Sequence, residues 1–204
     1  MRCVAADRPY AWRLVKRGDG PSVFVTHQGQ KSHARPVAGG IPQTTWIRRV
    51  VRHTLERAAP HVRGEVGVLL TDDDTMRHMN ARFRGLDAPT DVLSFPLGDG
   101  LNEGEPFGDV VISCPTARRQ ADRHGASLRE ELCRLLIHGT LHLCGYDHHA
   151  RREAARMHSL TRRLMTEVLS AAPGTAGGAR ARRKSRAPKK RPRRVSKRVG
   201  KAHA

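Results

Sequence analysis

The sequence predicts an α+β domain, in which a mixed sheet of about four strands carries packed helices, and a metal site lies on a helix and the turn after it. Short β-branched runs alternate with amphipathic segments, in the order strand, helix, strand, helix, two strands and then helices. This order is typical of helices packed on a single sheet. A histidine-rich motif, HGTLHLCGYDH, lies at the end of an apolar helical segment and marks the expected site.

The chain divides into three parts. Residues 21–170 are expected to form the domain, and residues 1–20 a variable or disordered extension, because they show no clear periodicity. Residues 171–204 form a basic tail with 13 Lys and Arg and no acidic side chain, whereas the preceding 170 residues hold 25 basic and 19 acidic side chains. Such a tail cannot build a core and is expected to be disordered when free. Its charge indicates a partner rich in phosphates, and a tail that is merely solvating is the alternative.

Four short apolar runs are the predicted strands. They are PSVFVTHQ (21–28), EVGVLLTDD (65–73), DVLSFP (91–96) and GDVVIS (108–113). Their β-branched content and the turn residues that bound them favour strands over helices. Two of them follow each other without an intervening helix, so at least one pair is expected to be connected by a loop alone.

Five segments are predicted to be helical. The first begins at Thr44 and ends before Pro60, and the second begins after Asp72 or Asp73 as its cap. The second is expected to place Met76, Met79 and Phe83 on one apolar face. The others are about 115–123, the motif helix opened by the capping box Ser127 to Glu130, and about 150–170 with Ala154, Met157, Leu160 and Leu164 buried.

The motif places His138, His142 and His148 at the spacing H-x3-H-x5-H. Four residues along a helix bring two side chains to the same face, about 6 Å apart. Gly145 can take the left-handed conformation that stops a helix, after which His148 can return as a third ligand. Three imidazoles without a fourth protein ligand indicate a catalytic zinc site, and chance clustering in a chain with 12 histidines is the alternative.

The same spacing occurs in the zinc-protease pattern H-E-x-x-H-x-x-G-x-x-H, with one difference. The glutamate that serves proteases as general base is Gly139 here, which argues against a peptidase. A structural zinc in a non-catalytic protein stays open as an alternative, but structural sites normally use four protein ligands.

The segment LCRLLIHGTLHLCGYDH (132–148), taken with MNARFRGLDAPTDVLSFP (79–96) and GDVVIS, closely resembles the YbeY family of bacterial metal-dependent endoribonucleases. The resemblance spans roughly residues 65 to 165 and implies an RNase specific for single strands, acting in 16S rRNA 3′ end maturation and ribosome quality control. It implies that one Zn²⁺ ion is held by the three histidines, other divalent metals not being excluded. The nucleophile stays open between a metal-activated water and the RNA 2′-OH.

Arg84 resembles the family's functional arginine and is the expected catalytic residue, because a guanidinium can bind phosphate in a bidentate manner. A solvated surface arginine is the alternative. Carboxylates near a metal-bound histidine commonly accept its second N–H. The candidates are Asp91, Asp109, Glu131 and Asp147, for all of which a purely structural role is also possible. His149 is an extra histidine that is expected to be exposed, and the alternative is that it competes as a metal ligand.

The expected partners are RNA, above all ribosomal RNA and ribosomal particles, with no membrane and no DNA specificity. A non-catalytic, zinc-containing RNA-binding protein of the ribosome is the alternative from another class. Aromatic residues make up only 4% of the chain, so recognition should depend on phosphates rather than on base stacking. Four cysteines without a CxxC pair, no run of about 18 apolar residues and no signal peptide predict a cytoplasmic protein.

Overall fold

The computed structural model describes residues 21–28, 41–147 and 150–171. The order of elements is β1 (Ser22–His27), α1 (Thr44–Ala58), β2 (Glu65–Thr71), α2 (Asp73–Arg84), β3 (Val92–Pro96), β4 (Pro106–Ser113), α3 (Cys114–His124), α4 (Leu128–Leu143) and α5 (Arg151–Ser170). This confirms the predicted α+β class and the predicted succession of strands and helices.

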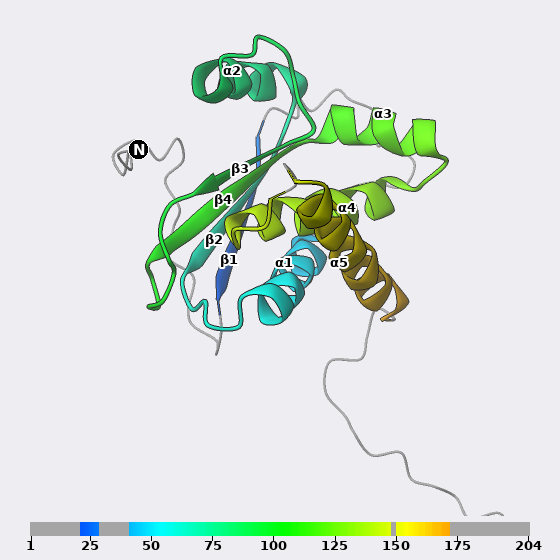
Figure 1. Cartoon of the computed structure of the whole chain (residues 1–204). Helices are drawn as coiled ribbons and strands as arrows, with labels where there is room; N and C mark the ends of the chain where they lie inside the picture. Colours follow the sequence, from blue (N-terminus) through cyan, green and yellow to red (C-terminus); the bar gives the residue numbers. More distant parts are fainter. Residues whose placement is uncertain (1–20, 29–40, 148–149, 172–204) are drawn as a thin grey trace, which may run out of the picture. The chain divides into compact units, whose positions relative to one another are not determined.

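The four strands form one mixed sheet in the order β1-β2-β4-β3. Strands β1 and β2 are parallel, as are β2 and β4, whereas β3 pairs antiparallel with β4 at the edge. The loop between β3 and β4 therefore makes a hairpin, while the parallel pairs need helical crossovers. The sheet is covered on both sides: α1 and α4 lie below it in Figure 1, with α5 packed on these two helices, and α2 lies above it.

The alternation of side chains along β2 and β4 divides the core into two parts. Val66, Val68 and Leu70 belong to the large buried cluster that also contains residues of α1, α4 and α5. Leu69 and Val111, which point the other way, join a smaller cluster with Met76 and Met79 of α2. Strands buried on both faces read as continuous apolar runs, which is why EVGVLLT shows no polar alternation.

Capping residues set several helix boundaries, and the caps at Asp72 and Ser127 confirm the expectations. The Asp72 carboxylate accepts from the Thr75 N–H at 2.9 Å and opens α2. Ser127 and Glu130 form the complete capping box at the start of α4. Gly85 and Gly125 end α2 and α3 with φ near +70° and +64°, conformations that glycine adopts without strain.

Several details differ from the expectations. Strand β4 begins at Pro106, two residues earlier than predicted, because it pairs with β2 from Glu65 onward. Helix α2 extends through Arg84. Phe83 was expected on one apolar face with Met76 and Met79 but is 48% exposed, and its ring contacts Phe95 edge-on. Ala154 and Leu160 are only partly buried, whereas Met157 and Leu164 are in the core.

No helix in the part of the chain that the structure describes is long and apolar enough to cross a membrane. The expected extension 1–20, the tail from residue 172 and His148 with His149 lie outside the described residues.

Candidate metal centre

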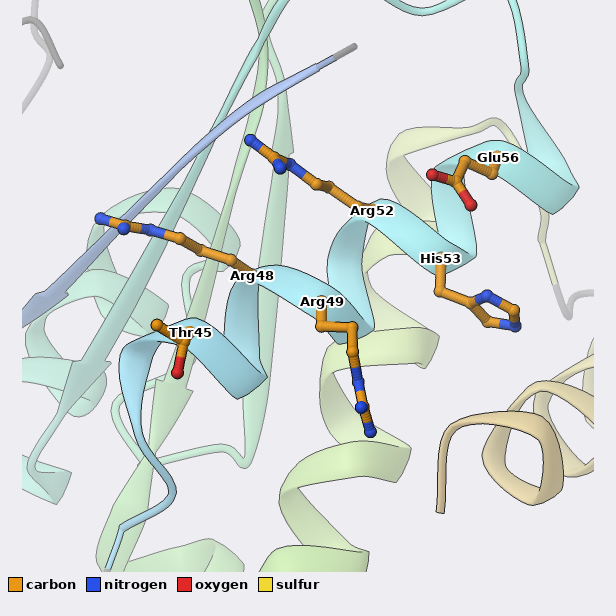
Figure 2. Close-up of a pocket in the computed structure, with 6 residues that line it drawn as sticks. All are labelled: Thr45, Arg48, Arg49, Arg52, His53 and Glu56. Carbon is orange, nitrogen blue, oxygen red and sulfur yellow. The ribbon is translucent and has the colours of Figure 1, made fainter. Parts of the chain in front are cut away.

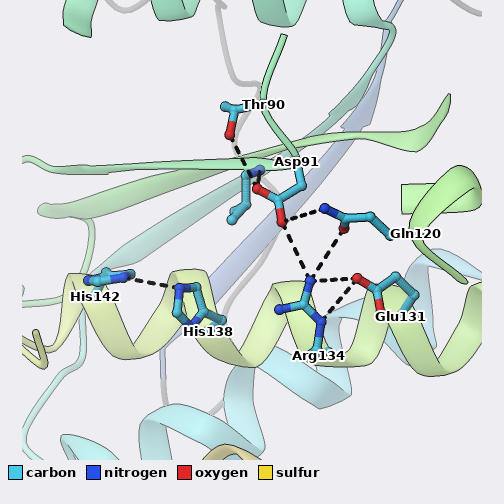
Figure 3. Close-up of polar contacts among 8 residues, drawn as sticks. Thr90, Asp91, Gln120, Glu131, Arg134, His138 and His142 are labelled. Atoms are coloured by element: carbon cyan, nitrogen blue, oxygen red, sulfur yellow. Dashed lines mark hydrogen bonds and ion pairs between the residues drawn. The ribbon is translucent and has the colours of Figure 1, made fainter. Parts of the chain in front are cut away.

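Helix α4 holds the first two predicted ligands. One side of this helix is buried in the core, including Leu132, Leu135 and Leu136. His138 and His142 lie one turn apart on another side and are partly exposed. Their rings are nearly perpendicular, with centroids 4.7 Å apart, and their Nε2 atoms approach to 3.2 Å. Figure 3 shows the two rings converging on the same side of α4.

This geometry fits a shared metal ion. Two nitrogens bound to one tetrahedral zinc at about 2.0–2.1 Å are about 3.3 Å apart. The separation of the two Nε2 atoms, 3.2 Å, is close to that value. His138 and His142 can therefore supply two neighbouring ligands of one ion without a change of backbone.

Helix α4 ends in a turn at Gly145, before the predicted third ligand. Gly145 has φ of +82°, and the Tyr146 N–H donates to the Leu141 carbonyl at 3.0 Å. Cys144 and Tyr146 pack against the core rather than toward the histidine pair. Among the described residues no group of three potential metal ligands occurs, and the predicted third ligand, His148, lies outside them.

Gly139 lies where α4 comes closest to the sheet. A Cβ atom at this position would be 2.7 Å from Val110 Cγ1, 3.1 Å from Ser94 Oγ and 3.2 Å from Val92 Cγ2. The Ser94 hydroxyl also donates to the Gly139 carbonyl at 3.1 Å. The position that carries a protease glutamate therefore has no room for any side chain, which gives the absence of that base a steric reason.

A polar network lies one turn before His138. Arg134 donates to the buried Glu131 carboxylate, with 3.0 Å from Nε to Oε1, and its Nη2 is 3.5 Å from Asp91 Oδ2. Gln120 of α3 also donates to Asp91, at 3.2 Å. The network joins α3, α4 and the start of β3, as Figure 3 shows.

Asp91 and Glu131 therefore have structural partners and do not accept an N–H from either described histidine. Arg134 pairs with both carboxylates because it lies one turn after Glu131 on α4, reaches Asp91 at the start of β3, and is always charged. Burial alone would lower the pKa of Arg134, but hydrogen bonding and charge from Glu131, together with Asp91, raise it above its ordinary value. Sequence reasoning missed Arg134, although its position four residues before His138 was a usable signal.

The remaining candidate site residues lie in different parts of the fold. Asp109 was expected to open a strand but is the fourth residue of β4 and is partly buried. Asp147 follows the turn and is exposed. Arg84 is exposed at the end of α2 and makes no hydrogen bond or ion pair within the described chain. Its neighbour Phe83 contacts Phe95 of β3, so this end of α2 lies against β3. Strand β3 also contacts α4, because the Ser94 hydroxyl donates to the Gly139 carbonyl.

Fold and site together define a small α+β domain in which a histidine-bearing helix lies across a mixed sheet. The family model described as endoribonuclease YbeY matches residues 39–169. The chain belongs to this family.

Similar proteins carry the same name. The endoribonuclease YbeY of Persephonella marina is 42% identical over 133 residues, covering 60% of this chain and 84% of that protein. The endoribonuclease YbeY of Chelativorans is 39% identical over 137 residues, covering 64% and 84%. Among solved structures, the solution structure of TM1509 from Thermotoga maritima is similar, with 25% identity, a TM-score of 0.48 and coverage of 72% of this chain and 89% of that one.

Proposed function

We propose that this protein is a zinc-dependent endoribonuclease that hydrolyses phosphodiesters in single-stranded RNA. Membership of the endoribonuclease YbeY family supports the reaction class. The observation that carries the metal dependence is the pair of imidazole Nε2 atoms 3.2 Å apart on α4. His148 is proposed as the third ligand, on the strength of the motif spacing.

The residues have distinct roles in this proposal. A zinc ion held by the histidines supplies Lewis-acid chemistry toward water or a phosphate oxygen. Arg84 holds the scissile phosphate and offsets the negative charge that develops on it. Because Gly139 leaves no room for a carboxylate on the helix, no protein base occupies the protease position.

Arg134 and its two carboxylates fix the orientation of α4. They connect this helix to β3 and α3, so the histidine pair keeps its position relative to the sheet edge. In this assignment Asp91, Glu131 and Arg134 position the site and do not contact the substrate.

The biological substrate that we propose is ribosomal RNA, in 16S rRNA 3′ end maturation and ribosome quality control. The strongly basic sequence from residue 179 to 204 supports a partner rich in phosphates. Because this sequence is rich in Lys and Arg and poor in apolar residues, we assign it to raising the local concentration of RNA or ribosomal particles and not to orienting the scissile bond.

The decisive experiment measures cleavage of a labelled single-stranded RNA together with zinc content. Wild-type protein should cut the RNA, lose activity with a chelator and regain it when Zn²⁺ is restored. His138→Ala, His142→Ala and His148→Ala should each lose zinc and activity. Full zinc retention in all three variants would refute the metal site. Zinc binding without any cleavage would favour the non-catalytic alternative.

A further inference from the structure

The outward face of α1 carries a basic groove that is separate from the histidine pair. Its inner face is buried, with Ile47, Val50 and Val51 in the core. Its outer face borders a hollow of ≈ 360 Å³, shown in Figure 2 and lined by Thr45, Arg48, Arg49, Arg52, His53 and Glu56. None of these residues belongs to the site described above.

No carboxylate pairs with the three arginines of this basic groove among the described residues. Arg49 donates to the carbonyls of Val168 and Ala171 at 3.1 and 3.3 Å, and Arg52 donates to the Pro21 carbonyl at 3.2 Å. A carbonyl satisfies an N–H group but does not neutralise a guanidinium. Within the described chain none of the three arginines forms an ion pair, so the groove has a positive potential. Glu56, which lines the groove, and Glu167, which is bonded to His53 at 2.8 Å, reduce it.

Arg48 is the least satisfied of the three. Its Nε is shielded from solvent and has no hydrogen-bond partner. An unmet buried donor costs on the order of 1–3 kcal/mol, so a shift of this side chain that gives the Nε–H an acceptor would lower the free energy. In Figure 2, Arg48 and Arg52 extend in the same direction toward β1, whereas Arg49 turns toward α5.

The arrangement suits a linear polyanion better than a small ligand. Arg48 and Arg52 are one turn apart, about 6 Å along the helix, which is the scale on which a nucleic acid backbone spaces its phosphates. The groove is lined by no Phe, Tyr or Trp, so it offers no platform for base stacking. It can therefore bind phosphates without reading sequence.

We propose that the basic groove of α1 binds the phosphodiester backbone of RNA at a distance from the scissile bond. The inference rests on the RNA-cleaving function proposed above and extends it to a second contact surface. Elements that carry the histidine pair do not line this groove, so its effect should be on affinity and not on the chemical step.

The test measures the affinity of full-length protein for a long fluorescent polyuridylate across a salt series. A chelator is present, so binding is recorded without cleavage and does not depend on the nuclease proposal. Arg48→Gln with Arg52→Gln should flatten the slope of log K against log salt by about 1.4, since each phosphate contact to a single strand contributes about 0.7. If the affinities converge near 1 M salt, binding at 0.1 M should weaken about 25-fold.

Arg63→Gln with Arg123→Gln is the matched control. These exposed arginines also donate to backbone carbonyls and lie outside the groove, so the same charge is removed elsewhere. The basic tail is present in both double variants, and its contribution cancels. Cleavage of a short RNA by the metal-loaded groove variant should stay at the wild-type rate.

Two further variants keep the test decisive. Arg48→Gln alone breaks no hydrogen bond among the residues that the structure describes, so it is expected to fold even where the double variant does not. It should give half of the slope change. Glu56→Gln should strengthen binding. If both arginine variants show the same slope of log K against log salt as the control, the proposal is wrong. A protein partner would then be the remaining candidate for this groove.

Discussion

Replacement of Gly139 by alanine tests the packing on which the metal centre depends. The added Cβ would be 2.7 Å from Val110 Cγ1, and Val110 is fully buried with a β-branched side chain that cannot rotate away at low cost. Either α4 or β4 must shift. The Ser94 hydroxyl, which donates to the Gly139 carbonyl, would be displaced with it.

Two opposing contributions set the size of the effect. Overpacking a tight core typically costs about 1–3 kcal/mol. Alanine in a helix interior is favoured over glycine by about 1 kcal/mol, which offsets part of that cost. The expected net loss is about 1 kcal/mol of unfolding free energy, or a decrease in Tm of about 2–4 °C for a domain of this size.

Denaturant unfolding of Gly139→Ala, Val110→Ala and the double variant measures this directly. Val110→Ala removes the methyl group that the new Cβ meets, so the two changes should be less destabilising together than the sum of the single effects. A Gly139→Ala protein at least as stable as the wild type, combined with additive effects, would refute the steric argument. Gly139→Glu should fold poorly and should not acquire peptidase activity.

Four further predictions concern the remaining parts of the molecule. Arg134→Ala should cost about 2–3 kcal/mol in denaturant unfolding because it leaves the buried Glu131 carboxylate unpaired, and an apolar replacement of both residues should recover most of that loss. Arg84→Ala should retain zinc and change the unfolding free energy by less than about 0.5 kcal/mol, yet lose most RNA cleavage; unaltered cleavage would contradict its role. Burial by itself raises the pKa of Asp73, but two hydroxyl donors and a paired arginine bring it below the ordinary value of 3.8. Its contribution is therefore present above pH 3.8 and lost as the pH falls below it, so Asp73→Asn should be less stable at neutral pH and flatter in acid titration than the wild type. Truncation after Gly178 should leave turnover of a short RNA intact and flatten the salt dependence of long-RNA binding, and an unchanged slope would exclude tail contacts with RNA.

Local interactions explain why much of the fold could be predicted from the sequence. The capping oxygen of Asp72, the capping box at Ser127 and the glycine stops at Gly85 and Gly125 act within a few residues of the chain. The approach of His138 and His142 is similarly local, because helical geometry alone brings residues four apart to one face. These features could be predicted from the sequence without knowledge of any contact between distant segments.

Contacts between distant segments decided the rest. The sequence could not say that β4 lies between β2 and β3, since several strand orders bury the same apolar runs. It could not reveal that Asp91 pairs with Arg134, 43 residues away, or that the approach of Val110 in β4 leaves room only for glycine at position 139. The charge of the α1 groove likewise depends on which arginines meet carbonyls rather than carboxylates. Pairing and close packing between remote residues are properties of the assembled layers, because only the tertiary fold determines which side chains share a space.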